Sequence, residues 1–261
     1  MQEVPVLAAT GIVKYFGHVR ALDGADVSIG RSEIHALVGD NGAGKSTLVK
    51  IVAGVTQPQR GDLQLCGTHV EFSSPADARR AGIETVFQDL ALAGTLDAGE
   101  NVFLGRELTV SGFLGRIGFV DRRGMRTRAN TYLSAMGINL PSLSSPVENL
   151  SGGQMQAVAV ARAVYWHPQL LIMDEPTAAL GPYQTDQVLS VMQRVRDEEG
   201  ISILLISHSL PEVFRVADRI TVLRGGKCVF TRKTDELTLD LVVAAMTGAF
   251  TTEGNPPVVG L

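Results

Sequence analysis

The sequence has few cysteines, no long apolar run and no excess of positive charge. Its two cysteines, Cys66 and Cys228, have no metal-like spacing, so they indicate reduced thiols in a cytosolic protein. No run approaches the ~18 apolar residues of a membrane helix, and the N-terminus lacks the basic and apolar segments of a signal peptide. The formal net charge of −4 implies no nucleic acid or other polyanion as a general partner. We therefore expect a soluble chain that can still dock onto a membrane partner.

The apolar residues that are present form short runs separated by helical patterns. Hydrophobic residues make up 45% of the 261 residues, which suits one large globular domain or two small ones. Continuous apolar runs at 169–174 and 201–207 are typical of central parallel strands. Before them, runs at 7–16 and 25–30 predict an antiparallel β-layer, and runs at 62–67 and 69–72 predict further short strands. The alternation of strands and helices predicts an α/β fold with a parallel central sheet.

The stretch from Gly39 to Thr47, GDNGAGKST, reads as G-x-x-x-x-G-K-[ST], a loop that wraps phosphates between a strand and a helix. Its glycines let successive backbone N–H groups point at one centre. Lys45 carries a compact charge that can reach the β- and γ-phosphates. Ser46 offers a hydroxyl to Mg²⁺, and Thr47 offers one to a phosphate oxygen. A strand-like run precedes the loop and a helical pattern follows it, as this interpretation requires.

The apolar run at 169–174 ends in one acid and is followed directly by a second. A strand that ends in Asp174 delivers a carboxylate to the carboxyl edge of the sheet, where Mg²⁺ is held in such sheets. Glu175 can then face the γ-phosphate and polarise an attacking water. Gln88, after the short strand expected at 83–87, can touch Mg²⁺ or the water. His208, at the end of the run 201–207, can hydrogen-bond the γ-phosphate.

The sequence LSGGQ, residues 150–154, begins another expected helix. Ser151 is an N-cap residue, and the glycines after it leave backbone N–H groups bare, so this helix start can bind an anion. Its order in the chain, after the phosphate loop and before the acid-tipped strand, is highly specific. The other four histidines have no comparable placement and are interpreted as structural; they are His18, His35, His69 and His167.

Taken together, these motifs resemble the ATP-binding cassette (ABC) ATPases over nearly the whole chain. The resemblance implies a P-loop NTPase core with an antiparallel β-layer and an inserted helical subdomain. It implies a single ABC domain, with a nucleotide-binding core at about 1–89 and 158–250 and a helical signature subdomain at about 90–157. Residues 251–261, rich in proline and glycine, are expected to form a flexible tail.

The resemblance also implies roles for individual residues. Glu175 would be the general base, assisted by His208 as γ-phosphate sensor and by Gln88. Mg²⁺ would be held by Ser46, Gln88 and Asp174. ATP would contact Phe16, stacked on adenine, and Gly39, Asp40, Asn41, Gly42, Ala43, Gly44, Lys45, Ser46 and Thr47. Ser151 and Gly153 would contact the γ-phosphate bound by a second copy, so the resemblance implies a head-to-tail homodimer.

One position departs from the family pattern. Many cassettes continue P-T-S-A-L-D after the glutamate, and here Gly181 replaces the aspartate that bridges to the partner site. The base machinery is intact, so hydrolysis is expected, and the coupling between two ATP sites is in question.

The finer resemblance is to single-cassette subunits of bacterial sugar importers of the fructose and ribose type. It implies a peripheral protein on the cytoplasmic face of the inner membrane, with two transmembrane permease subunits and, indirectly, a periplasmic or extracellular sugar-binding protein as partners. Three alternatives stay open: an importer subunit for a non-sugar solute, a soluble ABC ATPase acting on nucleic acid or ribosomes, and a nucleotide-binding regulator without hydrolysis.

An arginine cluster in the helical stretch allows two interpretations, a solvated face with local ion pairs or part of a docking surface. Its members are Arg106, Arg116, Arg122, Arg123, Arg126 and Arg128.

Overall fold

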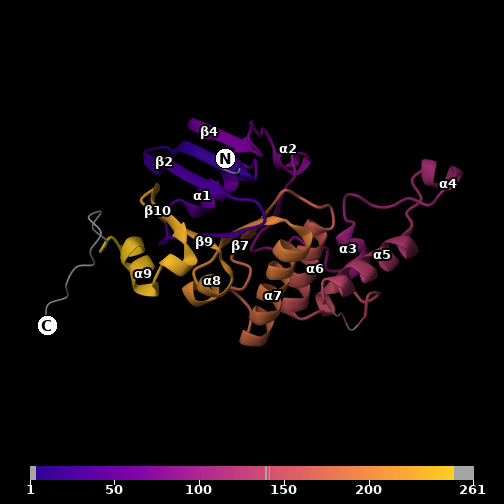
Figure 1. The fold of residues 1–261 in the computed structure, drawn as a ribbon. Helices are drawn as coiled ribbons and strands as arrows, with labels where there is room; N and C mark the ends of the chain where they lie inside the picture. Colours follow the sequence, from indigo (N-terminus) through magenta and orange to yellow (C-terminus); the bar gives the residue numbers. More distant parts are fainter. Residues whose placement is uncertain (1–3, 139, 141, 250–261) are drawn as a thin grey trace.

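The central element of this computed structural model is a six-stranded sheet, with the order β10-β9-β3-β8-β7-β6 (Figure 1). The structure describes residues 4–249 except 139 and 141, so the expected flexible tail lies outside the described residues. All neighbours in the sheet are parallel except the β9–β10 hairpin. The strands are β3 (Ile34–Val38), β6 (Ile83–Val86), β7 (Leu170–Asp174), β8 (Ser202–Ile206), β9 (Arg219–Arg224) and β10 (Lys227–Lys233).

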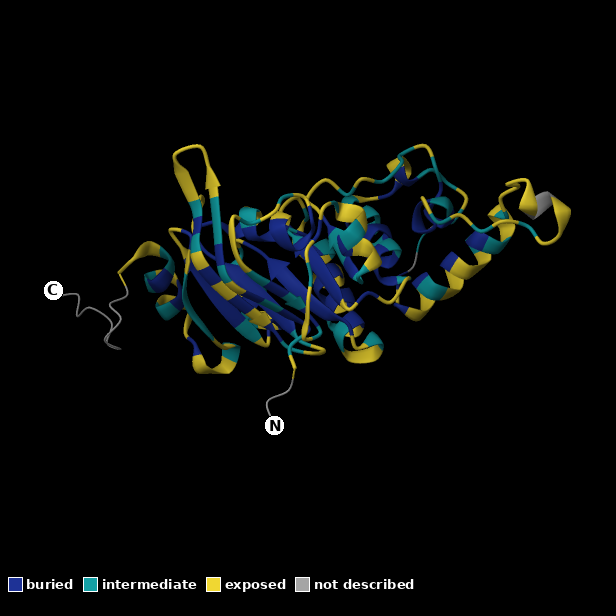
Figure 2. Cartoon of the chain, turned by 90° about the horizontal axis from the view of Figure 1, so that it is seen from above, coloured by how far each residue is buried: buried dark blue, intermediate teal, exposed yellow. Residues whose placement is uncertain are grey.

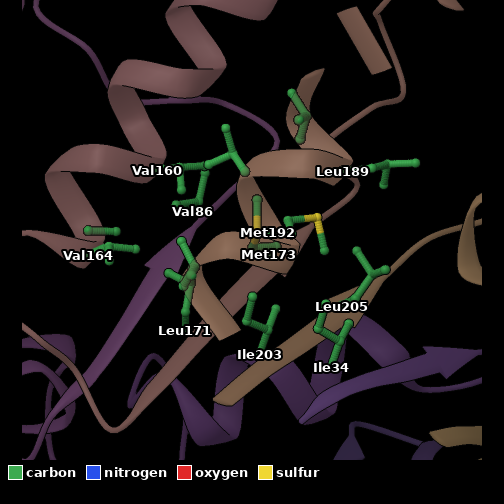
Figure 3. Close-up of a cluster of buried hydrophobic side chains, with 14 of the residues drawn as sticks. Ile34, Val86, Val160, Val164, Leu171, Met173, Leu189, Met192, Ile203 and Leu205 are labelled. Atoms are coloured by element: carbon green, nitrogen blue, oxygen red, sulfur yellow. The ribbon is translucent and has the colours of Figure 1, made fainter. Parts of the chain in front are cut away.

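The parallel strands are buried on both faces, which explains their continuous apolar sequence. In β7, Leu171 and Met173 point to one face while Leu170 and Ile172 point to the other. Figure 3 shows the first face, where Leu171 and Met173 meet side chains of α6 and α7 such as Val160. Helix α6 spans Gly152–Val164 and α7 spans Pro182–Glu199. The predicted α/β fold with a parallel central sheet is confirmed.

The opposite face carries α1 (Lys45–Val52), α2 (Pro75–Arg80) and a second sheet with the order β2-β1-β4-β5. This sheet is antiparallel throughout, as expected. Its strands differ in extent from the expectation. Strand β5 is only Thr68–His69, whereas a strand was expected at 69–72, and β2 begins at Val19 rather than near Ala25. The remaining strands are β1 (Leu7–Phe16) and β4 (Arg60–Leu65).

The stretch after β6 forms a helical arm at one end of the sheet (Figure 1). The arm contains α3 (Ala98–Val102), α4 (Phe113–Arg116), α5 (Arg122–Ala135) and the 3₁₀ turn η1 (Val147–Asn149). Helix α3 packs on both α5 and α6. Asp97 caps α3 and also accepts from Arg126 of α5 at 2.6 Å, so one buried carboxylate joins the two helices. Helices α8 (Leu210–Val216) and α9 (Leu239–Thr247) bury Val213, Val216, Val242 and Ala245 in the same core as α6 and α7, so they cover the rest of that sheet face, and the 3₁₀ turn η2 (Thr234–Glu236) lies between β10 and α9 in the chain.

Helix ends follow local sequence. Ser74 caps α2 ahead of Pro75, and Ser151 with Gln154 forms a capping box at the start of α6. Gly200 ends α7 in the left-handed conformation with φ of 68°. Both cysteines are free thiols. Within the described part of the chain, every helix is too short or too polar to cross a bilayer.

Candidate functional site

Four neighbouring strands deliver the predicted site residues to one edge of the central sheet. The strand order β3-β8-β7-β6 places side by side the segments that follow these strands. They are the phosphate loop after β3, His208 after β8, Glu175 after β7 and Gln88 after β6. The carboxyl edge of an open parallel sheet is where such folds bind ligands. Residues up to 169 positions apart in the sequence therefore become neighbours.

These segments line a cavity of about 560 Å³. This volume lies within the about 300–1,000 Å³ that small-molecule sites occupy. Of the residues predicted for ATP, catalysis or Mg²⁺, those lining it are Asn41, Gly42, Ala43, Gly44, Lys45, Ser46, Thr47, Gln88, Asp174, Glu175 and His208.

The phosphate loop is built around Gly44 and Lys45. Gly44 has φ of 109° and precedes α1, so the bare N–H groups of the helix start face the cavity. A Cβ at Gly44 would come within 2.7 Å of the Ala21 carbonyl oxygen, so only glycine fits. The Lys45 ammonium donates to the carbonyl oxygens of Gly39 at 2.7 Å and Asp40 at 3.1 Å. Burial lowers the pKa of Lys45, opposed chiefly by the charge of Glu175.

The β9–β10 hairpin holds the phosphate loop from behind. Its turn lies at Gly225-Gly226, and both glycines have positive φ. The Gly226 N–H donates to the Ala43 carbonyl at 3.0 Å, and the Gly226 carbonyl accepts from the Asp23 N–H at 2.8 Å. One turn thus ties the loop to strand β2 of the antiparallel sheet.

The two acids differ in backbone conformation and in partners. Glu175 has φ of 54°, an unfavourable conformation for a non-glycine residue, costing about 1–3 kcal/mol. Its carboxylate lies 3.0 Å from Nε2 of His208, and its N–H donates to the Ile206 carbonyl at 2.9 Å. Burial raises the pKa of Glu175 and that of Asp174, while nearby His208 and Lys45 oppose the rise. Strain and perturbed carboxylates concentrate at functional sites.

The segment after Gln88 is held by side chains that the sequence analysis did not single out. Arg162 of α6 donates to the carbonyls of Leu90 and Ala91, both at 2.8 Å. Farther on, the fully buried Asn101 side chain bonds the backbone of Ala93 in both directions. Arg162 sits eleven residues beyond Ser151 on the same helix. The Gln88 loop and the LSGGQ turn are therefore connected through α6.

The LSGGQ turn does not meet the cavity of its own chain. Ser151 and Gly153 are absent from the cavity lining. The Ser151 hydroxyl accepts from the Gln154 N–H at 3.3 Å, and a Cβ at Gly153 would come within 2.9 Å of Cβ of Gln184. Gln184 in turn accepts from the Gly181 N–H at 3.2 Å. The LSGGQ turn therefore packs against the start of α7, close to Gly181, where the sequence departs from the family pattern.

Phe16 also lies outside the cavity lining, as do Gly39 and Asp40. Phe16 is half exposed at the end of β1, paired in register with Val19, which does line the cavity. The structure adds lining residues that the motifs did not indicate: Val19, Arg20, Ala21, Ala178 and Ile206. Those on β2 were missed because the strand was expected to begin six residues later.

The oxygen donors at the cavity fit a hard divalent cation. Ser46 supplies a hydroxyl, Gln88 an amide oxygen and Asp174 a carboxylate, and all three line the same space. Mg²⁺ is bound in proteins by one or two carboxylates together with hydroxyls, waters and substrate phosphates. Within the described residues, no cluster of three or more histidine, cysteine or acidic side chains forms a separate metal site.

A glycine-rich loop before a helix, a buried lysine and an acid-tipped neighbouring strand define a P-loop nucleotide-binding protein. The sequence model of the family described as ABC transporter matches residues 22–178. The fructose import ATP-binding protein FrcA of Rhizobium meliloti is 46% identical over 95% of this chain and 96% of its own length. The xylose/arabinose import ATP-binding protein XylG of Sulfolobus acidocaldarius is 44% identical over 93% and 94%. The chain belongs to the ABC transporter ATP-binding family, and like its members it is an ATPase.

Solved structures agree with this assignment. The ADP conformation of MJ1267, an ATP-binding cassette of an ABC transporter, has a TM-score of 0.79 at 25% identity, covering 92% of this chain and 95% of that one. A nucleotide-free ATP-binding cassette has a TM-score of 0.75 at 26% identity, covering 88% and 91%. The ribose import protein RbsA 1 of Burkholderia thailandensis is 41% identical over 97% of this chain and only 48% of its own length. The predicted P-loop core with an antiparallel layer and a helical insertion is confirmed.

Proposed function

We propose that this chain is the ATP-hydrolysing subunit that energises import of a small solute, a simple sugar, through a membrane transporter. The observation that carries the proposal is the convergence of Lys45, Glu175 and His208 on one cavity at the sheet edge. Its likeness to the fructose and xylose/arabinose import proteins supports the sugar class. Intact Glu175 and His208 favour hydrolysis over nucleotide binding alone.

In this proposal, the phosphate loop binds the phosphates of ATP through the N–H groups around Gly44, and the Lys45 charge reaches the β- and γ-phosphates. Ser46, Gln88 and Asp174 would hold Mg²⁺, which when bound neutralises charge on the phosphate oxygens. The partial burial of Lys45 and Asp174 strengthens these interactions.

Glu175 acts as general base towards the attacking water. Its position, 3.0 Å from His208, lets the histidine orient the carboxylate and contact the γ-phosphate. Burial raises the pKa of Glu175, which brings it closer to the working pH and makes the carboxylate a better proton acceptor. The left-handed backbone at Glu175 aims the carboxylate into the cavity, at the cost of local strain.

Two copies complete the sites. Ser151 presents its hydroxyl and Gly153 its backbone N–H at a helix start, and neither residue lines the cavity of its own chain. We propose that they close the cavity of a second copy in a head-to-tail homodimer, with Phe16 stacking on adenine at the cavity's outer end. A dimeric ABC transporter cassette among the solved structures supports the fold-level likeness. The dimer would sit on two permease subunits at the cytoplasmic face of the membrane, supplied by an external sugar-binding protein.

The base assignment is tested with Glu175→Gln. The amide keeps the size and a hydrogen bond to His208, so ATP binding is retained. Removal of a general base lowers kcat by about 10²–10⁴-fold. Steady-state ATP hydrolysis is measured in the reconstituted transporter, with Glu71→Gln, at an exposed position just after β5, as a matched charge control. Near-normal kcat in Glu175→Gln contradicts the base assignment.

The importer assignment is tested by affinity purification of the tagged chain from detergent-solubilised membranes. Co-purification of two membrane subunits, with sugar-stimulated ATPase activity after addition of the binding protein, is the expected result. Recovery with ribosomes or nucleic acid and without membrane subunits refutes importer function.

A further inference from the structure

The outer end of the helical arm carries a group of exposed apolar side chains. We define the tip loop as residues 109–120, which includes α4. Figures 1 and 2 show it projecting away from the body of the molecule, and Figure 2 colours most of it as exposed. The exposed fractions are 75% for Phe113, 56% for Ile117, 56% for Phe119 and 41% for Val120. Exposed large apolar residues gathered in this way mark interaction sites.

The tip loop is held in shape by its neck. The Val110 N–H donates to the Phe119 carbonyl at 2.9 Å, and Thr109 forms an antiparallel bridge with Val120. Just below, the Asp121 N–H donates to the Leu108 carbonyl at 2.7 Å. The apolar side chains are therefore presented on a closed loop, so binding orders few additional residues.

The arginine cluster divides into two groups around this loop. One group serves the arm itself: Arg106 pairs with Glu84, Arg122 with Glu100 and Arg126 with Asp97. The other group is exposed and, among the described residues, has no ion-pair partner; its members are Arg116, Arg123 and Arg128. Arg116 belongs to the tip loop, and Arg123 lies at the start of α5 directly after it. Local ion pairs therefore account for the first group and not for the second.

We propose that the tip loop is a lipid-contact element that docks onto an anionic bilayer surface. A projecting surface cannot enclose a small molecule, which requires a concave site. Phenylalanine and isoleucine side chains enter the boundary between headgroups and acyl chains, while arginine binds lipid phosphates through paired N–H donors. The charge of Arg116 and Arg123 matches an anionic surface, and no acid within the tip loop opposes them.

The test is flotation of the purified full-length chain with vesicles of phosphatidylcholine alone or mixed with phosphatidylglycerol. We expect association with the mixed vesicles, weakening as salt is raised. The double variant Phe113→Ser, Phe119→Ser is expected to lower the partition coefficient by at least about tenfold. Arg116→Gln with Arg123→Gln is expected to lower it by about fivefold for each charge. Tyr183→Ser on α7, with the same 75% exposure as Phe113, is the matched control and leaves partitioning unchanged.

Tryptophan fluorescence provides a direct measurement of insertion of the tip loop into the bilayer. Trp166 is the only tryptophan in the chain and lies outside the tip loop, so wild-type fluorescence provides the baseline. In Phe113→Trp, brominated acyl chains in the mixed vesicles are expected to quench the added fluorescence. No association of the wild type with mixed vesicles at low salt, or equal association of the Phe113 and Phe119 double variant, overturns the proposal. Association that occurs only when permease is reconstituted into the vesicles also overturns the proposal. The main flotation test uses vesicles without permease, so its outcome does not depend on the importer assignment.

Discussion

Arg162 joins the segment after Gln88 to helix α6, which begins at the LSGGQ turn. Its guanidinium donates to the Leu90 and Ala91 carbonyls, each at 2.8 Å, across more than seventy residues of sequence. The bond to Leu90 is partly buried and the bond to Ala91 is exposed. We expect Arg162→Ala to release the segment that follows Gln88 and to leave the LSGGQ turn in place.

The magnitude follows from these two bonds. A partly buried hydrogen bond from a charged donor contributes about 1.5–3 kcal/mol, and an exposed one, which water replaces, contributes about 0.5–1 kcal/mol. The substitution is therefore expected to lower the free energy of opening of this segment by about 2–4 kcal/mol. A decrease of about 2 kcal/mol corresponds to a ~30-fold rise in the amide hydrogen-exchange rate of residues 88–92. Misplacement of Gln88 is expected to lower kcat about 10–100-fold.

The assay pairs hydrogen exchange of residues 88–92 with steady-state ATP hydrolysis. Arg162→Lys, which can reach only one carbonyl, is expected to fall between the wild type and Arg162→Ala. Arg194→Ala is the matched control, because Arg194 also donates to a backbone carbonyl, that of Met136 at 2.9 Å, but away from the cavity. This control should lose stability without faster exchange at 88–92. Unchanged exchange and turnover in Arg162→Ala refute the reasoning.

Three further outcomes are expected. Gly181→Asp causes no steric clash, because nothing lies within 4 Å of a Cβ at this position. Aspartate is a better N-cap for α7 than glycine, so the substitution should raise the free energy of unfolding by a few tenths of a kcal/mol. A loss of stability in urea titration contradicts this. Gly226→Ala places a Cβ 2.9 Å from the Ala21 carbonyl at φ of 77°, so we expect a loss of about 1–3 kcal/mol and weaker binding of a fluorescent nucleotide analogue; an unchanged titration contradicts the link to the phosphate loop. The folded pKa of Glu175 is raised from 4.5, so the wild type loses stability as pH rises through that folded pKa. The stability of nucleotide-free Glu175→Gln relative to wild type should therefore increase from about pH 4.5 to pH 7, and a constant difference in urea titrations argues against the raised pKa.

Much of the fold could be predicted because its signals are local. Continuous apolar runs at 169–174 and 201–207 indicated doubly covered strands, and β7 and β8 are buried on both faces. The expectation of a strand at 69–72 was wrong because β5 pairs only briefly, through Thr68 and His69, with β4. The start of β2 at Val19 was missed because Val19 and Arg20 are exposed and so lack the alternation of a half-buried strand.

Some residues of the candidate site could likewise be predicted from local sequence, and others could not. The phosphate loop, the acids Asp174 and Glu175 and the N-cap at Ser151 are visible in sequence, because a short stretch of backbone and side chains performs each function. Arg162 and Asn101 carried no signal, since their partners are backbone carbonyls whose identity the sequence does not reveal. In the sequence, the tip loop was indicated only by the arginine cluster. The structure distinguishes Arg116, which is exposed, from Arg106, which pairs with Glu84.

Local chemistry could be predicted from the residues alone: which of them can hold phosphate, which acids end a buried strand and where the LSGGQ helix begins. Which of these groups share a space depends on how the strands are arranged in the folded chain. The order β3-β8-β7-β6 brings Gln88, Glu175 and His208 to one cavity and leaves Ser151 outside it. The physical reason is that caps, turns and apolar periodicity arise from neighbouring residues, whereas strand order arises from long-range pairing and burial that form only in the folded chain.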